Sequence, residues 1–183
     1  VATFARSSRD VAGSLRDDTW EFYDGAWHEV RGPLAPSPRG DTSLTYDPVG
    51  RRMVLFGGAT AEGKQGDTWS YDGTWTKLAP PHAPDVRGQH NATFDRARGQ
   101  VILFGGSTAT GVRADTWAFD GVDWAPVALA SAPAPRLRHA MYFDDRRGAI
   151  VLYGGQRDDG SRLCDTWALD AKGWTPIGDY PDG

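Results

Sequence analysis

One short motif, repeated four times, limits what this chain of 183 residues can fold into. The motif is Asp-Thr-Trp, and a second tryptophan follows shortly after each copy. Its copies begin 49, 48 and 50 residues apart, at Asp18, Asp67, Asp115 and Asp165. A period of this length indicates a repeat protein, in which one supersecondary unit stacks on the next.

Two further markers keep the same period. Glycine pairs end apolar runs, and they lie at Gly57-Gly58, Gly105-Gly106 and Gly154-Gly155. An arginine precedes a different run in the same three copies, at Arg39, Arg87 and Arg136. Because three independent markers share one spacing, the repeat is genuine. All 8 tryptophans belong to it, so we expect them to build the fold.

Each repeat predicts four short antiparallel strands. In the third copy, residues 101–104 form a continuous run, Val-Ile-Leu-Phe, which is typical of a strand covered on both faces. Residues 116–119 alternate, with Trp117 and Phe119 on one face. Turn sequences such as Asp-Gly-Thr and Asp-Arg-Ala-Arg-Gly separate the runs. Helical periodicity is absent, so the sequence predicts an all-β fold with four strands per period of about 48 residues.

The order of these markers resembles the kelch repeat over essentially the whole chain. The resemblance implies a kelch-type β-propeller, in which four-stranded blades pack face to face around a channel. We expect one domain over 1–183, with fifteen strands in four blades at 1–34, 39–80, 87–129 and 136–178. The first blade is expected to lack its innermost strand, because no arginine-led run precedes it and Ala5-Arg6 replaces the glycine pair.

Three arrangements are compatible with these four blades. The chain is a piece of a longer propeller, a half-ring that pairs with another chain, or a small ring of four blades. We favour the first two, a partial ring or half-propeller, because exposed strand edges and a bare apolar blade face are liabilities that an isolated chain should not tolerate. Homo-oligomers and further blades from a longer chain are therefore both possible partners.

Most repeated residues are predicted to be structural. A blade that is apolar on both faces needs its own aromatic set to pack against the next blade. The glycine pairs allow positive φ and a close approach to the neighbouring backbone. The expected structural residues are Trp20, Trp27, Trp69, Trp75, Trp117, Trp124, Trp167, Trp174, Gly57, Gly58, Gly105, Gly106, Gly154, Gly155, Asp67, Asp115 and Asp165.

Ligand binding is expected on the face that carries the longer and more varied connections. These connections join strands 2 and 3 of each blade, or one blade to the next, at 5–17, 59–66, 78–87, 107–114, 129–136 and 156–164. Varied loops on a rigid scaffold are where binding usually occurs. The non-repeating charged candidates on this face are Arg6, Lys64, Arg113, Arg157, Asp158, Asp159 and Arg162.

The repeated arginines have two possible roles. Arg39, Arg87 and Arg136 begin the strand expected to be innermost, near the channel mouth, where a guanidinium could bind a carboxylate or phosphate bidentately. Alternatively, an arginine that repeats with the fold satisfies carbonyls or a neighbouring aspartate. Both roles stay open from the sequence, and the second is favoured.

No catalytic residue, metal site or cofactor site is predicted. His90 and His139 share the repeat position of Thr42, which favours hydrogen bonding to backbone over metal binding. Serine-histidine-aspartate, phosphate-loop and zinc-type cysteine spacings are absent. The single cysteine, Cys164, excludes an internal disulfide and is expected to be a small packed residue.

Composition narrows the possible functions. The net charge of −4 and the pI near 5.5 argue against nucleic-acid binding, and no apolar run approaches the roughly 20 residues of a membrane helix. The leading hypothesis is a non-catalytic binding module for a peptide, glycan or protein. An assembly unit and part of a kelch-type enzyme acting on sugars are the alternatives. The Asp-Thr-Trp version resembles bacterial, often exported, kelch repeats, which favours an extracellular or envelope location.

Overall fold

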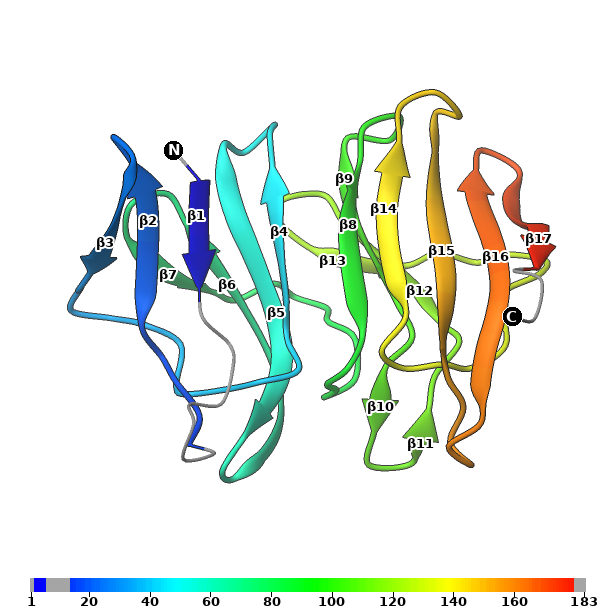
Figure 1. The fold of residues 1–183 in the computed structure, drawn as a ribbon, viewed down its shortest axis with the longest axis horizontal. Coiled ribbons are helices and arrows are strands. Elements are labelled where there is room, and N and C mark those ends of the chain that lie inside the picture. Colours follow the sequence, from blue (N-terminus) through cyan, green and yellow to red (C-terminus); the bar gives the residue numbers. More distant parts are fainter. Residues whose placement is uncertain (1, 6–13, 180–183) are drawn as a thin grey trace.

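The fold consists of antiparallel sheets that follow one another along the chain. A computed structural model describes residues 2–5 and 14–179, and within these ranges it contains no helix. No helix in the described part of the chain could therefore cross a membrane. Figure 1 shows the first sheet at one end of the molecule and the last sheet at the other.

Seventeen strands form four sheets and one separate hairpin in the described residues. Sheet 1 contains β1 (Ala2–Ala5), β2 (Thr19–Tyr23) and β3 (Ala26–Val30). Sheet 2 contains β4 (Ser43–Asp47), β5 (Arg52–Thr60), β6 (Gly63–Tyr71) and β7 (Trp75–Leu78). Sheet 3 contains β8 (Asn91–Asp95), β9 (Gln100–Phe104), β12 (Thr116–Phe119) and β13 (Trp124–Pro126). Sheet 4 contains β14 (Ala140–Asp144), β15 (Ala149–Gln156), β16 (Arg162–Asp170) and β17 (Gly173–Asp179).

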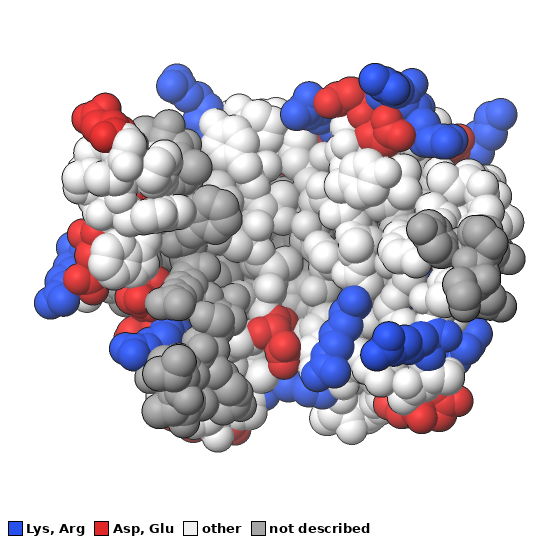
Figure 2. Space-filling model, in the orientation of Figure 1, with Lys and Arg blue, Asp and Glu red and all other residues white. Residues whose placement is uncertain are grey.

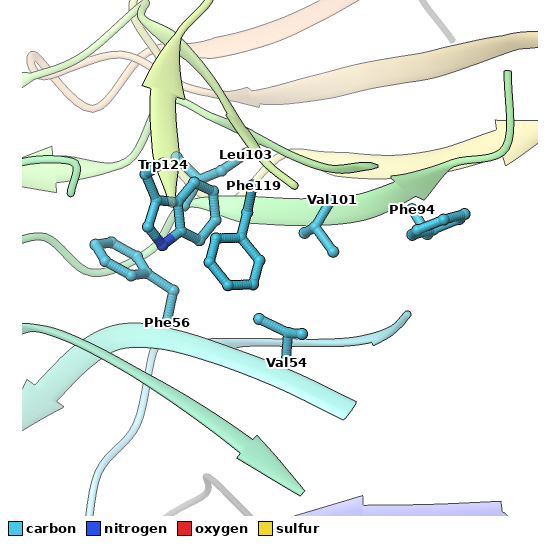
Figure 3. Close-up of a cluster of buried hydrophobic side chains, with 7 residues drawn as sticks. All are labelled: Val54, Phe56, Phe94, Val101, Leu103, Phe119 and Trp124. Carbon is cyan, nitrogen blue, oxygen red and sulfur yellow. The ribbon is translucent and has the colours of Figure 1, made fainter. Parts of the chain in front are cut away.

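The hydrophobic core lies between the sheets. In β9, Val101 and Leu103 belong to the cluster shared with sheet 2, whereas Ile102 and Phe104 belong to the cluster shared with sheet 4. All four side chains are buried. Because neighbouring residues of a strand point to opposite faces, a continuous apolar run is what a strand covered on both sides requires. Figure 3 shows the first cluster, in which Val54 and Phe56 of sheet 2 face sheet 3.

A tryptophan from each later sheet also donates a hydrogen bond to a threonine of the sheet before it. The indole Nε1 of Trp124 lies 3.0 Å from Oγ1 of Thr68, and its ring lies 5.2 Å from that of Phe56. The equivalent indole bonds join Trp75 to Thr19 at 2.8 Å and Trp174 to Thr116 at 3.0 Å. Buried indole N–H groups need an acceptor, so these bonds fix how one sheet aligns with the next.

The glycine pairs allow a second close contact between sheets. Gly105 and Gly106 have φ of 65° and 89°, and the amide of Gly106 donates to the carbonyl of Arg136 at 2.9 Å. A Cβ on Gly105 would lie 2.6 Å from that same carbonyl oxygen. The positive φ and close approach predicted for this pair are therefore confirmed.

The structure corrects several details. The four sheets contain the fifteen expected strands, but β10 (Ser107–Thr108) and β11 (Gly111–Val112) add a hairpin inside the predicted loop 107–114. The predicted loops 59–66 and 156–164 are short turns instead, because β5 and β15 continue past their glycine pairs.

Two side chains differ from their expected burial. Trp27 is 49% exposed, because it lies on the face of sheet 1 that is turned away from sheet 2. Cys164 is exposed and not packed, because Leu163 beside it takes the buried side of β16.

We predict that alanine at Gly105 destabilises the fold far more than alanine at Gly148. Both glycines have φ near 60°, but a Cβ on Gly148 would meet nothing within 4 Å. Gly148→Ala should cost about 1–2 kcal/mol of left-handed strain. Gly105→Ala should cost roughly 1–3 kcal/mol more, because sheet 4 must move. Urea unfolding measures both, and equal losses would contradict the close approach.

Candidate functional site

Each repeated arginine is held inside its own sheet. The guanidinium of Arg87 makes a bidentate pair with Asp115, with both Nη–Oδ distances at 2.7 Å. Its Nη1 also donates to the carbonyl of Gly105 at 3.0 Å, and its Nε donates to that of Asp85 at 3.0 Å. The side chain is completely buried. Such a planar, fork-shaped group matches the carboxylate and fixes where the strand after it begins.

The aspartate of each pair also accepts the indole of its own motif. Trp117 Nε1 donates to Asp115 Oδ2 at 2.8 Å. Burial alone would raise the pKa of the Asp115 carboxyl, but the hydrogen bonds and charge of Arg87 outweigh it, so the pKa lies below its usual value. The repeated order Arg, Gly-Gly and Asp-Thr-Trp is thus one connected hydrogen-bonded unit.

The same unit recurs in sheets 2 and 4. Arg39 pairs with Asp67 at 2.6 Å and Arg136 pairs with Asp165 at 2.6 Å, and both arginines are buried. The ligand-binding role considered for Arg39, Arg87 and Arg136 does not fit this geometry. Their guanidinium groups are buried and already hydrogen-bonded to protein carboxylates. The structure favours their other predicted role, as structural partners of carbonyls and aspartates.

A row of three polar residues lies directly beside these units. Asp41, Gln89 and Arg138 each follow the repeated arginine by two positions, and their φ values are 56°, 60° and 57°. The amide of Gln89 donates to the carbonyl of Asp41 at 2.8 Å, and that of Arg138 donates to the carbonyl of Gln89 at 2.9 Å. Left-handed backbone is uncommon for residues other than glycine and tends to cluster at functional sites.

The side chains of this row differ in chemistry. Asp41 and Arg138 are exposed and Gln89 is half-buried. With its amide oriented to satisfy both groups, Gln89 accepts hydrogen bonds from Nη2 and Nε of Arg138 at 2.8 and 3.2 Å. We call Asp41, Gln89 and Arg138 the rim row. It presents an acid, an amide and a base in sequence along one edge.

The hairpins next to the rim row are tied to one another. Lys64 Nζ donates to Ser107 Oγ at 2.7 Å and to the carbonyl of Thr108 at 3.0 Å. Arg113 Nη2 lies 3.0 Å from Asp85 Oδ2, in the connection between sheets 2 and 3. These two predicted candidates therefore link neighbouring connections, which restricts the motion of the face that carries them.

The remaining candidates lie in and after the turn between β15 and β16, which begins beside the rim row because Gln156 forms a β-bridge with Leu137. Arg157, Asp158 and Asp159 are exposed at the turn between β15 and β16, and Arg162 is exposed at the start of β16. Within that turn, hydrogen bonds from the side chain of Ser161 and from its amide, which lies 2.8 Å from Asp159 Oδ1, lower the pKa of the Asp159 carboxyl. Arg6 lies outside the described residues. The structure thus ties Lys64 and Arg113 to neighbouring connections, whereas Arg157 and Asp159 hydrogen-bond within their own turn.

Sequence reasoning missed the rim row. Its members are not glycines, so nothing in their identity indicated positive φ. One signal was available: the position two residues after each repeated arginine changes from Asp to Gln to Arg, while the arginine itself does not change. A constant position with a changing side chain is what a variable binding surface on a fixed backbone produces.

A groove of about 460 Å³ lies along β4, β8 and β14, at the end of these strands that is opposite to the rim row. Its walls include Tyr46 at the end of β4, Phe94 at the end of β8, and Arg96 in the turn that follows. Figure 2 shows charged side chains along the upper and lower edges of the molecule in this view and few between them. None of the predicted ligand-binding residues lines the groove.

The two repeated histidines are buried and lie close to the glycine pairs. His90 Nε2 is 3.0 Å from Ser43 Oγ, whereas both ring nitrogens of His139 are buried without a hydrogen-bond partner. Burial lowers the pKa of His90 and of His139 to about 3, so both are neutral at pH 7. Among the described residues, no group of three or more metal-binding side chains comes together.

Comparisons with known proteins inform the fold alone. No protein-family model matches the chain, and no curated protein is significantly similar to it in sequence. The chain is similar to the solved structure of YjhT, with a TM-score of 0.71 and 15% identity over 94% of this chain. It spans 61% of that protein's length. The shared feature is therefore an all-β arrangement of antiparallel sheets.

Because His90 and His139 are buried as neutral groups, we predict that stability begins to fall at a pH well above the range in which carboxylates titrate. In the unfolded chain these two histidines bind protons below about pH 6.5, whereas in the folded chain they stay neutral down to about pH 3. The free energy of unfolding should therefore fall as the pH falls from 6.5. His90→Thr with His139→Thr, the residue found at position 42, should flatten the curve between pH 6.5 and 5.

Urea unfolding at several pH values measures this effect. The paired aspartates, whose pKa values are lowered, add their own loss at lower pH, below about 4. A wild-type curve that is flat from pH 6.5 to 5, or one unchanged by the double substitution, would show that the histidines are not buried as neutral groups.

Proposed function

We propose that the four sheets are blades of a kelch-type β-propeller and that this part of the protein is a non-catalytic binding module. Every sheet keeps its strands in chain order, and β4, β8 and β14 lie side by side along one edge of the stack (Figure 1). Among the described residues, no strand of sheet 1 corresponds to β4. These features support blades around an axis, with β4, β8 and β14 innermost.

The rim row carries the proposal for binding. Its three positions share one backbone conformation, and the bonds between their main chains make the row continuous from sheet 2 to sheet 4. The strain of left-handed backbone, about 1–2 kcal/mol per residue, persists at all three positions although glycine would remove it. The gain is that three different polar side chains stand at fixed spacing on one edge.

The neighbouring connections extend this surface. Lys64 and Arg113 hold adjacent connections together, so a ligand would meet loops that are already ordered. Ordering before binding lowers the entropic cost of association. We therefore propose that the ligand contacts the rim row and the turns beside it at the same time.

The chemistry of the row favours a polar ligand with both donors and acceptors. The Asp41 carboxylate accepts hydrogen bonds from hydroxyl or amide groups, and Arg138 donates to carboxylate or carbonyl oxygens. Glycans and peptides present such groups at regular spacing. A peptide, a glycan or a protein that carries either one is the proposed partner class.

The test is a binding screen followed by substitution of the row. Glycan and peptide arrays probed with the chain should yield a ligand, and Asp41→Asn with Arg138→Asn should weaken its binding by roughly 10-fold or more. Asparagine tolerates positive φ, so the double variant should unfold at nearly the same urea concentration as the wild type.

The chain offers a matched control for this variant. Arg96 and Asp145 form an exposed pair 2.9 Å apart in the turns at the opposite end of β8 and β14. Arg96→Asn with Asp145→Asn makes the same chemical changes there and should leave binding intact. Binding that is lost in the control pair or in Tyr46→Ala, but kept in the rim variant, would place the ligand in the groove and overturn this assignment.

A further inference from the structure

On the basis of the binding role proposed above, we propose that the rim row selects an extended peptide with two opposite charges. A basic side chain of the peptide binds Asp41, and an acidic side chain binds Arg138. These two residues are the ends of the row, and both are exposed. A neutral glycan supplies neither counter-charge, whereas a peptide can supply both.

The guanidinium of Arg138 is held in one orientation and keeps one edge for a ligand. Its Nη2 and Nε both donate to the side-chain oxygen of Gln89, at 2.8 and 3.2 Å. In the part of the chain that the structure describes, its Nη1 has no hydrogen-bond partner. The edge formed by Nη1 and Nη2 can therefore take a carboxylate bidentately. Because Gln89 already orients the group, less side-chain entropy is lost when that carboxylate binds.

Asp41 provides an uncovered carboxylate at the other end of the row. Its side chain stands over Gly88, where an added Cβ would lie 3.5 Å from the Cβ of Asp41. Glycine has no side chain with which to cover or pair with the carboxylate. Within the described residues, no donor is hydrogen-bonded to this group. A lysine or arginine of a ligand would supply the charge-assisted hydrogen bond that the protein does not.

The other charges beside the row do not alter its polarity. Lys64 is held by Ser107 Oγ at 2.7 Å, and Arg113 is held by Asp85 at 3.0 Å. The turn at 157–162, next to the Arg138 end, contains two arginines and two aspartates and so adds no net charge. The direction from acid to base is therefore set by the row itself.

The spacing of the row limits where the two charges of the peptide can lie. Main-chain hydrogen bonds join successive members of the row, so their backbones lie about 5 Å apart and its ends about 10 Å apart. In an extended peptide, residues two or four positions apart lie on one face, at about 7 or about 13 Å. A long basic side chain can span the difference. Residues one or three positions apart point to opposite faces and do not fit.

Peptide arrays test this selection. Each peptide carries one lysine and one glutamate at a spacing of one to four residues, with mixed residues elsewhere. Spacings of two and four should be enriched among the peptides that bind. For such a peptide, fluorescence polarisation should show roughly 5- to 10-fold weaker binding when glutamine replaces either charged residue. Added salt should weaken the binding of the charged peptide as well.

Single substitutions in the protein assign each charge to its partner. With Asp41→Asn, replacing the lysine of the peptide by glutamine should no longer change the affinity, whereas replacing its glutamate still should. Arg138→Asn should give the reverse pattern. Asparagine tolerates the positive φ of both positions. The control, Arg96→Asn with Asp145→Asn, should keep both dependences.

The outcomes separate this selection from the binding role itself. A glycan or peptide that binds regardless of its charge, and is lost in the Asp41→Asn, Arg138→Asn double variant, would overturn the charge selection and leave the binding role standing. An array without a doubly charged binder, or charge dependences that neither single variant alters, would also overturn the selection. Ligands that all bind the double variant as tightly as the wild type would overturn the binding role of the row.

Discussion

The structure depends on sheets that are apolar on both faces and must therefore be covered on both faces. Alternate residues of β9 belong to two different clusters, one on each side of sheet 3. A single sheet of this kind cannot exclude water, so stability comes from stacking. The indoles of Trp75, Trp124 and Trp174 each donate a hydrogen bond to a threonine of the sheet before their own. These bonds fix how neighbouring sheets align, in addition to the burial of the rings.

The candidate site is a consequence of this stacking. The glycine pair lets the main chain of the next arginine approach, and the arginine itself is fixed by an aspartate of its own sheet. The residue two positions after this fixed arginine has a left-handed backbone, and main-chain hydrogen bonds join it to the equivalent residue of the next sheet. Fold residues thus determine the backbone of the rim row, while its side chains are free to differ.

Much of the fold could be predicted from the repeat, because each marker has a direct physical role. The four sheets, the buried run 101–104 and the positive φ of Gly105 all follow from residue types. The left-handed backbone of the rim row could not be predicted, because the residue types at its three positions do not require positive φ. The exposure of Trp27 was also missed, since a repeat position does not reveal which sheet face is left uncovered in the described part of the chain.

A double-mutant cycle across Trp124 and Thr68 tests the central claim most directly. Trp124→Phe and Thr68→Val each remove one half of the indole–hydroxyl bond between sheets 2 and 3, which is 3.0 Å long and buried. If this bond couples the sheets, the double variant will lose about 0.5–1.5 kcal/mol less unfolding free energy than the sum of the two single losses. Additive losses would mean that the two sheets are not held together in this way.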